Sequence, residues 1–194
     1  MPMTRSRKAL LTLLVLGGVG AAAGAGTFSA FSSTTSNAGN SFAAGTVAIA
    51  DNDAGSALYN VSNQTPGDSV QRCIQVSYTG SLDASVRLYT ASAIGAIGPF
   101  VGLTVESGTQ ATPTFPSCTG FTPETTLFSG TLAGFASAHS SFATGLADDP
   151  GTTATKWING DSVVYRITAT LANDNAAQGT TSGAHTFTWE AQNQ

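Results

Sequence analysis

The residue types that most often carry metal or nucleophilic chemistry are scarce in this chain of 194 residues, which has two histidines and two cysteines. His139 lies in the run Ala-His-Ser-Ser without an acidic neighbour, and His185 opens a segment of alternating residues. Zinc peptidases commonly place two histidines four residues apart on one helix face, with a glutamate between them. No such motif occurs here. These observations predict no catalytic residue, no metal site, no cofactor and therefore no enzymatic activity.

Eleven acidic residues would allow carboxylate chemistry, but none lies in a recognisable motif. Asp51-Asn52-Asp53 resembles the start of a calcium loop, yet the glycine expected at the sixth position and the glutamate expected at the twelfth are absent. We interpret this segment as a turn and Asp148-Asp149 as a solvated loop. Whether either pair binds an ion is left open by the sequence. The Gly-x-Ser-x-Gly motif of serine hydrolases is also absent.

Cys73 and Cys118 have neither Cys-x-x-Cys spacing nor a histidine at ligand spacing. In an exported protein, two such cysteines pair by default because the compartment is oxidising, so we predict a disulfide between them. The two tryptophans are candidates for stacking on a sugar. Trp189 lies on the apolar side of an alternating segment and is expected in the core, whereas Trp157 precedes a turn and leaves that alternative open.

The first 30 residues have the composition of an export signal rather than of a folded element. Three cations precede an apolar run at 9–16, which is followed by small residues at 17–26. This order is typical of a secretory signal peptide, so we assign residues 1–30 to a cleaved signal. A retained membrane anchor is the alternative, because the apolar and small residues together are barely long enough to span a bilayer.

Two bonds compete for signal cleavage, one after Ala25 and one between Ala30 and Phe31, and we take the second. Removing the three cations of the signal leaves four Lys and Arg against eleven Asp and Glu, a net charge of −7. Phosphate recognition needs clustered basic residues, so nucleic acid is excluded as a partner. We also expect no membrane contact for the mature form.

Alternation of apolar and polar residues dominates the rest of the chain and predicts short strands joined by turns. A segment with helical spacing lies at 132–146, and a Thr- and Pro-rich segment at 111–128 is expected to be a long loop that contains Cys118. The pattern predicts an all-β protein, a jelly-roll-like antiparallel β-sandwich with one short helix in a loop. The expected strands lie at 42–49, 58–62, 70–78, 84–89, 100–106, 162–172 and 185–191.

Three blocks of the sequence resemble the TasA/camelysin family of exported bacterial and archaeal proteins. The first combines Gly-Thr-Phe-Ser-Ala-Phe-Ser at 26–32 with Asn-Ser-Phe-Ala-Ala-Gly-Thr-Val at 40–47. The second combines Asn-Gln-Thr-Pro-Gly-Asp-Ser-Val at 63–70 with Gly-Ser-Leu-Asp-Ala-Ser-Val at 80–86. The third is the closing Phe-Thr-Trp-Glu-Ala-Gln at 187–192.

The resemblance implies a jelly-roll subunit that polymerises into extracellular fibres of the biofilm matrix. In such fibres the segment after the cleavage site is donated as a β-strand to the next copy. Here that segment would be 31–41, with Phe31 and Phe42 as its apolar contacts. A signal peptidase of the SipW type would be the processing partner. Camelysin is described as a metalloprotease, so a secreted metalloprotease is one alternative function, and a monomeric cell-surface binding module is another.

We therefore expect three parts: a signal peptide at 1–30, an N-terminal segment at 31–45 as candidate donor strand, and a β-sandwich domain at 46–194. The expected function is a secreted structural subunit of extracellular fibres. Its partner would be a second copy of the same chain in a head-to-tail homopolymer. A disordered N-terminal tail is the alternative for the donor segment. The sequence leaves the trigger for assembly, the need for a partner and the role of residues 105–156 unassigned.

Overall fold

The computed structural model of this chain describes residues 41–150 and 156–193. The predicted signal peptide, the bond between Ala30 and Phe31 and the predicted donor residues 31–40 lie outside the described residues. The chain divides into two compact units, Met1–Ala43 and Ala44–Gln194, and the second contains the strands and helices. None of the helices in the described part is long and apolar enough to cross a bilayer.

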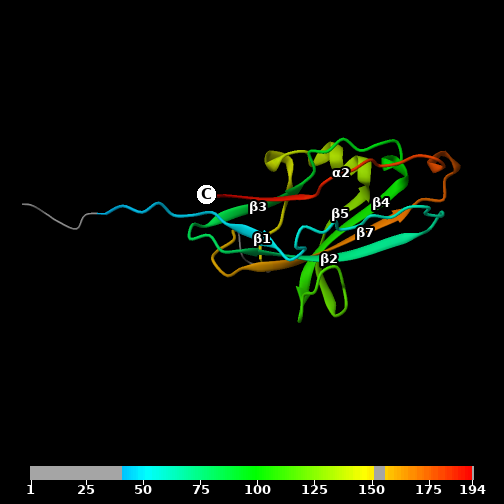
Figure 1. The fold of residues 1–194 in the computed structure, drawn as a ribbon. Coiled ribbons are helices and arrows are strands. Elements are labelled where there is room, and N and C mark those ends of the chain that lie inside the picture. Colours follow the sequence, from blue (N-terminus) through cyan, green and yellow to red (C-terminus); the bar gives the residue numbers. More distant parts are fainter. Residues whose placement is uncertain (1–40, 151–155, 194) are drawn as a thin grey trace, which may run out of the picture. The chain divides into compact units, whose positions relative to one another are not determined.

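Strands account for most of the regular structure between Ala44 and Gln194 (Figure 1). Short 3-10 helices occur at Gly98–Phe100, Phe142–Thr144 and Asn175–Ala177. The strands and the α-helix are β1 (Ile49–Asp51), β2 (Ser69–Tyr78), β3 (Ala84–Tyr89), β4 (Val101–Gln110), β5 (Phe121–Thr131), α2 (Leu132–Ala138), β6 (Leu146–Ala147), β7 (Ser162–Leu171) and β8 (Thr188–Asn193).

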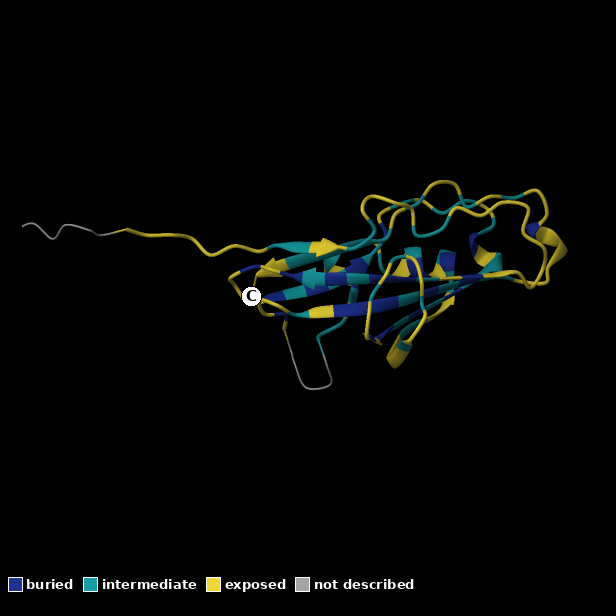
Figure 2. Ribbon diagram, turned by 60° about the horizontal axis from the view of Figure 1, so that its bottom comes forward, coloured by how far each residue is buried: buried dark blue, intermediate teal, exposed yellow. Residues whose placement is uncertain are grey.

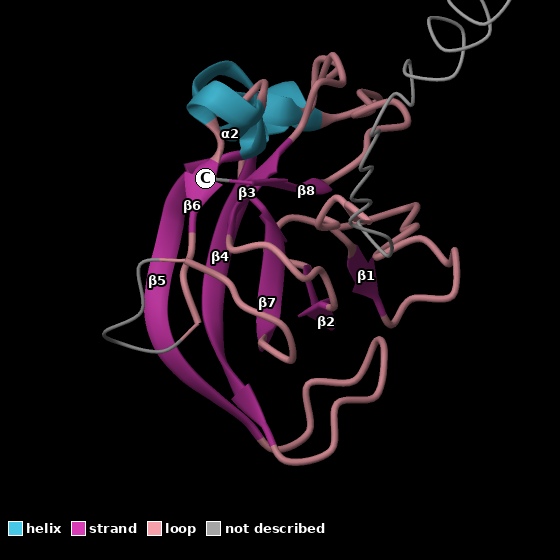
Figure 3. Ribbon diagram, turned by 90° about the vertical axis from the view of Figure 1, so that its left-hand side faces the viewer, coloured by secondary structure: helices cyan, strands magenta, loops and turns pink. Residues whose placement is uncertain are grey.

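The described strands form two antiparallel sheets that pack face to face. One sheet has five strands in the order β1-β2-β7-β4-β5, and the other has three in the order β6-β3-β8. Figure 3 shows the larger sheet as a curved wall, with α2 near one of its ends. This arrangement confirms the predicted all-β sandwich. The predicted short helix is α2, which forms within the segment of helical spacing at 132–146.

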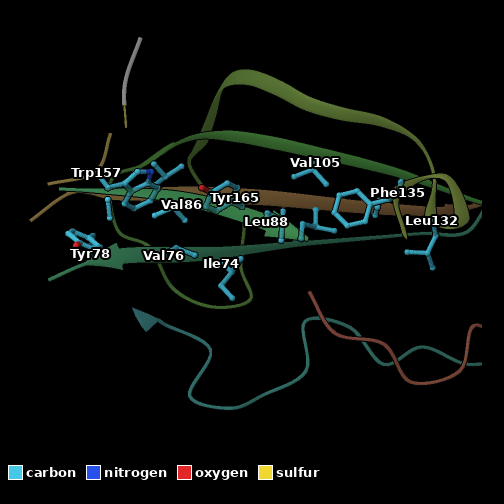
Figure 4. Packing of buried hydrophobic residues seen from close by; sticks show 14 residues of the cluster. Ile74, Val76, Tyr78, Val86, Leu88, Val105, Leu132, Phe135, Trp157 and Tyr165 are labelled. Carbon is cyan, nitrogen blue, oxygen red and sulfur yellow. The ribbon is translucent and has the colours of Figure 1, made fainter. Parts of the chain in front are cut away.

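Alternating side chains on the facing strands build the core between the sheets. In β2, Val76 and Tyr78 are almost fully buried, while Gln75 and Ser77 between them are partly exposed. β3 repeats this pattern and β4 follows it through most of its length, as expected for half-buried strands. Phe135 of α2 closes the core at one end (Figure 4). Dark blue positions along the strands in Figure 2 mark the buried side.

Three predicted strands differ from the structure at their bounds or in their existence. The strand expected at 42–49 is reduced to Ile49–Asp51, and the last strand begins at Thr188 instead of His185. The segment at 58–62 is a loop, so the prediction of a strand there was wrong. The consecutive residues Leu58 and Tyr59 both pack against the core from this loop, so burial does not follow the alternation of a strand.

β5 is the element that the sequence failed to reveal. The predicted long loop at 111–128 ends at residue 120, and Phe121–Thr131 forms an eleven-residue strand paired with β4. β5 is an edge strand with mostly exposed side chains, so it lacks the alternation that burial of one face imposes. Pro123 lies beside one of two register shifts in this pairing, and an edge strand tolerates proline there.

A disulfide joins Cys73 of β2 to Cys118 of the loop between β4 and β5, with the two Cα atoms 5.0 Å apart, which confirms the predicted pairing. Cys73 points to the outer face of its sheet yet is only 2% exposed. The loop that carries Cys118 lies beside Cys73 and shields it from solvent. The Cys73 N–H donates a hydrogen bond to the Pro116 carbonyl of this loop at 3.1 Å. The Gln110 side-chain amide also donates to two carbonyls of this loop.

Candidate functional site

His139 lies in an aromatic environment at the C-terminal end of α2. Its ring centroid is 5.1 Å from that of Phe135 and 5.7 Å from that of Phe128. Because a carbonyl oxygen only accepts, the Nδ1–H of His139 donates to the Thr144 carbonyl at 2.7 Å. This contact ties the turn after α2 to the helix, so His139 has a structural explanation in the fold.

His185 lies in the loop before β8 and contacts Tyr59 from the loop after β1. The Nδ1–H of His185 donates to the Gly183 carbonyl at 3.2 Å, so in the neutral ring Nε2 accepts from the Tyr59 hydroxyl at 2.8 Å. Burial raises the pKa of Tyr59 well above its usual value. Phe187 contacts both rings. The edge that carries β1 and β2 and the edge that carries β8 therefore lie on the same side of the sandwich.

A cavity of about 470 Å³ opens at this side, near the start of β2 and the end of β7. Its rim comes from the loops at 59–68 and 174–185, and both Tyr59 and His185 line it. β8 begins only at Thr188, so the smaller sheet stops short of this end of the larger one. The floor is apolar and consists of Val70, Ile97, Val101, Leu132, Ala169 and Leu171.

The four sheet edges differ in how they are protected against a further strand. β1 has three residues, and β6 has two. Beyond its pairing with β1, β2 is covered at Gln75, which exchanges two hydrogen bonds with Asn52, and at Cys73, which donates its N–H to the Pro116 carbonyl. The rest of that edge is the short stretch 69–72. β5 carries Pro123 and two register shifts. β8 has six residues and pairs with β3 alone in the described chain, which leaves its outer edge available.

The chain enters the sandwich at the end opposite to the cavity. Thr46 donates its N–H to the Ser81 hydroxyl at 2.9 Å, and its carbonyl accepts from the Ser81 N–H at 2.9 Å. Ser81 lies in the turn between β2 and β3, whereas the cavity lies at the start of β2. The ten residues of β2 separate the two ends by about 33 Å at ~3.3 Å per residue.

A buried polar cluster surrounds Asp148, which was predicted to lie in a solvated loop. Its Oδ1 accepts a hydrogen bond from the Ser107 hydroxyl at 3.2 Å, and its backbone carbonyl accepts the indole N–H of Trp157 at 2.6 Å. Burial raises the pKa of Asp148 to about 6, although Tyr165 and Ser107 act to lower it. The Tyr165 hydroxyl is itself buried, and its pKa is raised well above the usual value, chiefly by burial.

Replacing Asp148 with asparagine should flatten the pH dependence of stability. A folded pKa raised from 3.8 to about 6 favours the folded state below pH ~4, and this contribution is lost as the pH rises through about 6. Because Asp148 is only half-buried, we expect the wild-type free energy of unfolding to fall by about 1–2 kcal/mol over this range. Asp148→Asn should remove that fall in urea titrations at pH 4.5 and 7.5.

Asp53 provides the control for this prediction, since it is a carboxylate in the turn after β1 and its Oδ1 accepts the Gly55 N–H at 2.6 Å. In Asp53→Asn, the side-chain amide oxygen can still accept the Gly55 N–H. If Asp53→Asn flattens the pH dependence as much as Asp148→Asn does, the buried cluster is not its source.

The other predicted candidates have structural places. Trp157 is fully buried, so it has no face on which a sugar could stack. Trp189 packs against Tyr165 with ring centroids 5.3 Å apart, as expected for a core residue. Asp51 and Asp53 lie in or beside a turn in which the Asp51 carboxylate accepts the Asp53 N–H and the Asp53 carboxylate accepts the Gly55 N–H. Phe42 is fully exposed, whereas Phe31 lies outside the described residues.

The family model described as camelysin metallo-endopeptidase matches residues 8–97. This match, over somewhat less than half of the chain, supports the predicted resemblance to the TasA/camelysin family. The matched range covers residues 8–30 of the predicted signal, β1 to β3 and the 59–68 side of the cavity rim. It contains four of the five stretches that carried the resemblance. No curated protein matches the chain.

The description of the camelysin family as metallo-endopeptidases contradicts the prediction that the protein is not an enzyme. That prediction depended on the absence of a linear motif, and a fold can bring together ligands that are far apart in sequence. The described residues contain no cluster of three or more His, Cys, Asp or Glu that could hold a metal. Residues 1–40, 151–155 and 194 contain none of these four residue types. The donor set does not fit a metal centre.

Proposed function

We propose that this protein is a secreted subunit of extracellular fibres that assembles by donating its N-terminal segment, 31–41, to the next copy. The observation that carries the proposal is the outer edge of β8, the one sheet edge in the described chain that is neither very short, covered nor interrupted by proline. An added strand would satisfy the unpaired backbone groups of that edge. Segment 31–41 consists largely of Ser, Thr, Asn and Ala, so main-chain hydrogen bonds would supply most of its affinity.

The two ends of the sandwich support a head-to-tail arrangement. The donor segment precedes residue 44, at the end where Thr46 contacts Ser81, and the cavity lies at the other end. When these ends meet between two copies, the segment of one copy can lie along β8 of the other and run antiparallel to it. Such a contact leaves both outer ends of a dimer unsatisfied, so it continues into a filament.

The mature chain starting at Phe31 should elute as a polymer from a size-exclusion column and show thin filaments in negative-stain electron microscopy. The chain is acidic and monomers repel one another, so we expect filament formation to increase with salt. A chain that stays monodisperse at all concentrations and salt strengths contradicts the proposal.

The family match by itself favours a second function, a secreted metallo-endopeptidase. Such an activity would appear as casein digestion by the pure protein and would be lost with a chelator. Variants His139→Ala and His185→Ala would then locate the site, because these are the only two histidines in the chain. Digestion that resists the chelator contradicts this second function.

A further inference from the structure

We propose that the cavity near the start of β2 is an aromatic-binding pocket that receives the Phe42 side chain of the neighbouring copy. This inference rests on the proposed function and adds to it the place at which the donor segment is anchored. It also sets the direction of the segment. Phe42 lies at the cavity end of the acceptor, and Phe31 lies toward the opposite end.

Phe42 has the side chain that most needs a partner. Its exposed fraction is 103%, the highest of the large hydrophobic residues that the structure describes, and the next is Ile158 at 50%. A fully exposed phenylalanine leaves a large apolar area in water. Its neighbours Ser41 and Ala43 are small, so Phe42 is the one bulky anchor at this point of the segment.

Chain length excludes the cavity of the same copy as the site for Phe42. The sandwich begins two residues later, at Ala44, and two residues reach about 7 Å. The cavity lies at the far end of β2, about 33 Å away at ~3.3 Å per residue. Only a second copy, placed with its cavity end at this point, brings the cavity within reach of Phe42.

The cavity has the chemistry that such an anchor requires. Aliphatic side chains form its floor, and its volume of about 470 Å³ exceeds that of one aromatic ring. The rim carries the side-chain amides of Asn63, Gln64 and Gln178. These amides can form hydrogen bonds with the backbone on either side of an inserted Phe42. Val61 at the rim is 44% exposed and presents an apolar surface to an incoming segment.

Cross-linking between two single-cysteine variants tests the proposal while leaving Phe42 in place. Mature Ser41→Cys and mature Val61→Cys are mixed, allowed to assemble and treated with a short bismaleimide. Val61 is 44% exposed and the native cysteines are paired, so both variants should fold and each offers one free thiol. We expect cross-linked dimers from this mixture.

Ser36→Cys mixed with Val61→Cys is the matched control, because it makes the same substitution five residues earlier, about 17 Å away in an extended strand and between the two ends of the acceptor. It should give no cross-link. Cross-linking of Ser36→Cys instead of Ser41→Cys overturns the inference, while the fibre proposal stands. Filaments without either cross-link overturn the inference alone, and the absence of filaments overturns both.

A second test changes the size of the side chain at position 42 and measures the concentration needed for filament formation. Phe42→Ala should raise the concentration needed for filament formation about ten- to hundredfold, as loss of one buried aromatic side chain predicts. Phe42→Leu, which keeps an apolar side chain, should raise it less than Phe42→Ala does. Equal thresholds for wild type and Phe42→Ala overturn the inference even when filaments form, since the cavity would then receive something else.

Discussion

A mature chain that begins at Phe42, and so lacks residues 31–41, should form no filaments at concentrations where the chain from Phe31 assembles completely. The outer edge of β8 offers the backbone groups of six residues, and each main-chain hydrogen bond contributes about 0.5–1.5 kcal/mol. Losing several of them weakens association by at least about a hundredfold. The melting temperature should stay within about 2 °C, because the compact domain begins at Ala44.

A single position inside the segment provides a sharper form of this prediction. Thr35→Pro removes one backbone N–H and fixes one dihedral, whereas Thr35→Ala keeps the N–H and removes only the side chain. If main-chain pairing carries the affinity, proline should weaken assembly and alanine should leave it nearly unchanged. Filaments that persist after the deletion, or an alanine variant as weak as the proline variant, contradict donation of a β-strand.

The buried strands could be predicted from the sequence because burial of one face imposes a period of two on the side chains. β2, β3, β4 and β7 all carry that pattern, and their predicted positions are close to the observed ones. β5 is exposed on an edge, so nothing constrained its side chains to alternate, and its Thr and Pro residues suggested a loop. The disulfide followed from cysteine count and compartment, which do not depend on the fold.

The candidate site could not be predicted in the same way, because it depends on which strands are neighbours. The availability of β8 follows from the order β6-β3-β8, and the cavity follows from the late start of β8 relative to β2. Neither feature has a local pattern in the sequence. Asp148 is a further example: adjacent acids suggested solvent, but contacts with Ser107 and Trp157, 41 and 9 residues away, bring it into a buried cluster.

Removing the disulfide with the double variant Cys73→Ser/Cys118→Ser should lower the free energy of unfolding by about 4 kcal/mol. The two residues are 45 positions apart, and the chain-entropy model gives a loss of this size for such a loop. The same variant removes the covalent link between β2 and the loop that carries Cys118, and leaves the hydrogen bond from the Cys73 N–H to the Pro116 carbonyl as a remaining contact. Thermal and urea unfolding measure the loss, and dithiothreitol should lower wild-type stability while leaving the variant unaffected.

The disulfide also allows stability and assembly to be separated. It stabilises the edge of the larger sheet, whereas the proposed acceptor edge, β8, belongs to the smaller one. At temperatures where the variant is still folded, its concentration for filament formation should therefore match that of the wild type within about threefold. A variant that folds but no longer assembles contradicts β8 as the acceptor edge, because the disulfide joins β2 of the larger sheet to the loop between β4 and β5 and leaves the smaller sheet unchanged.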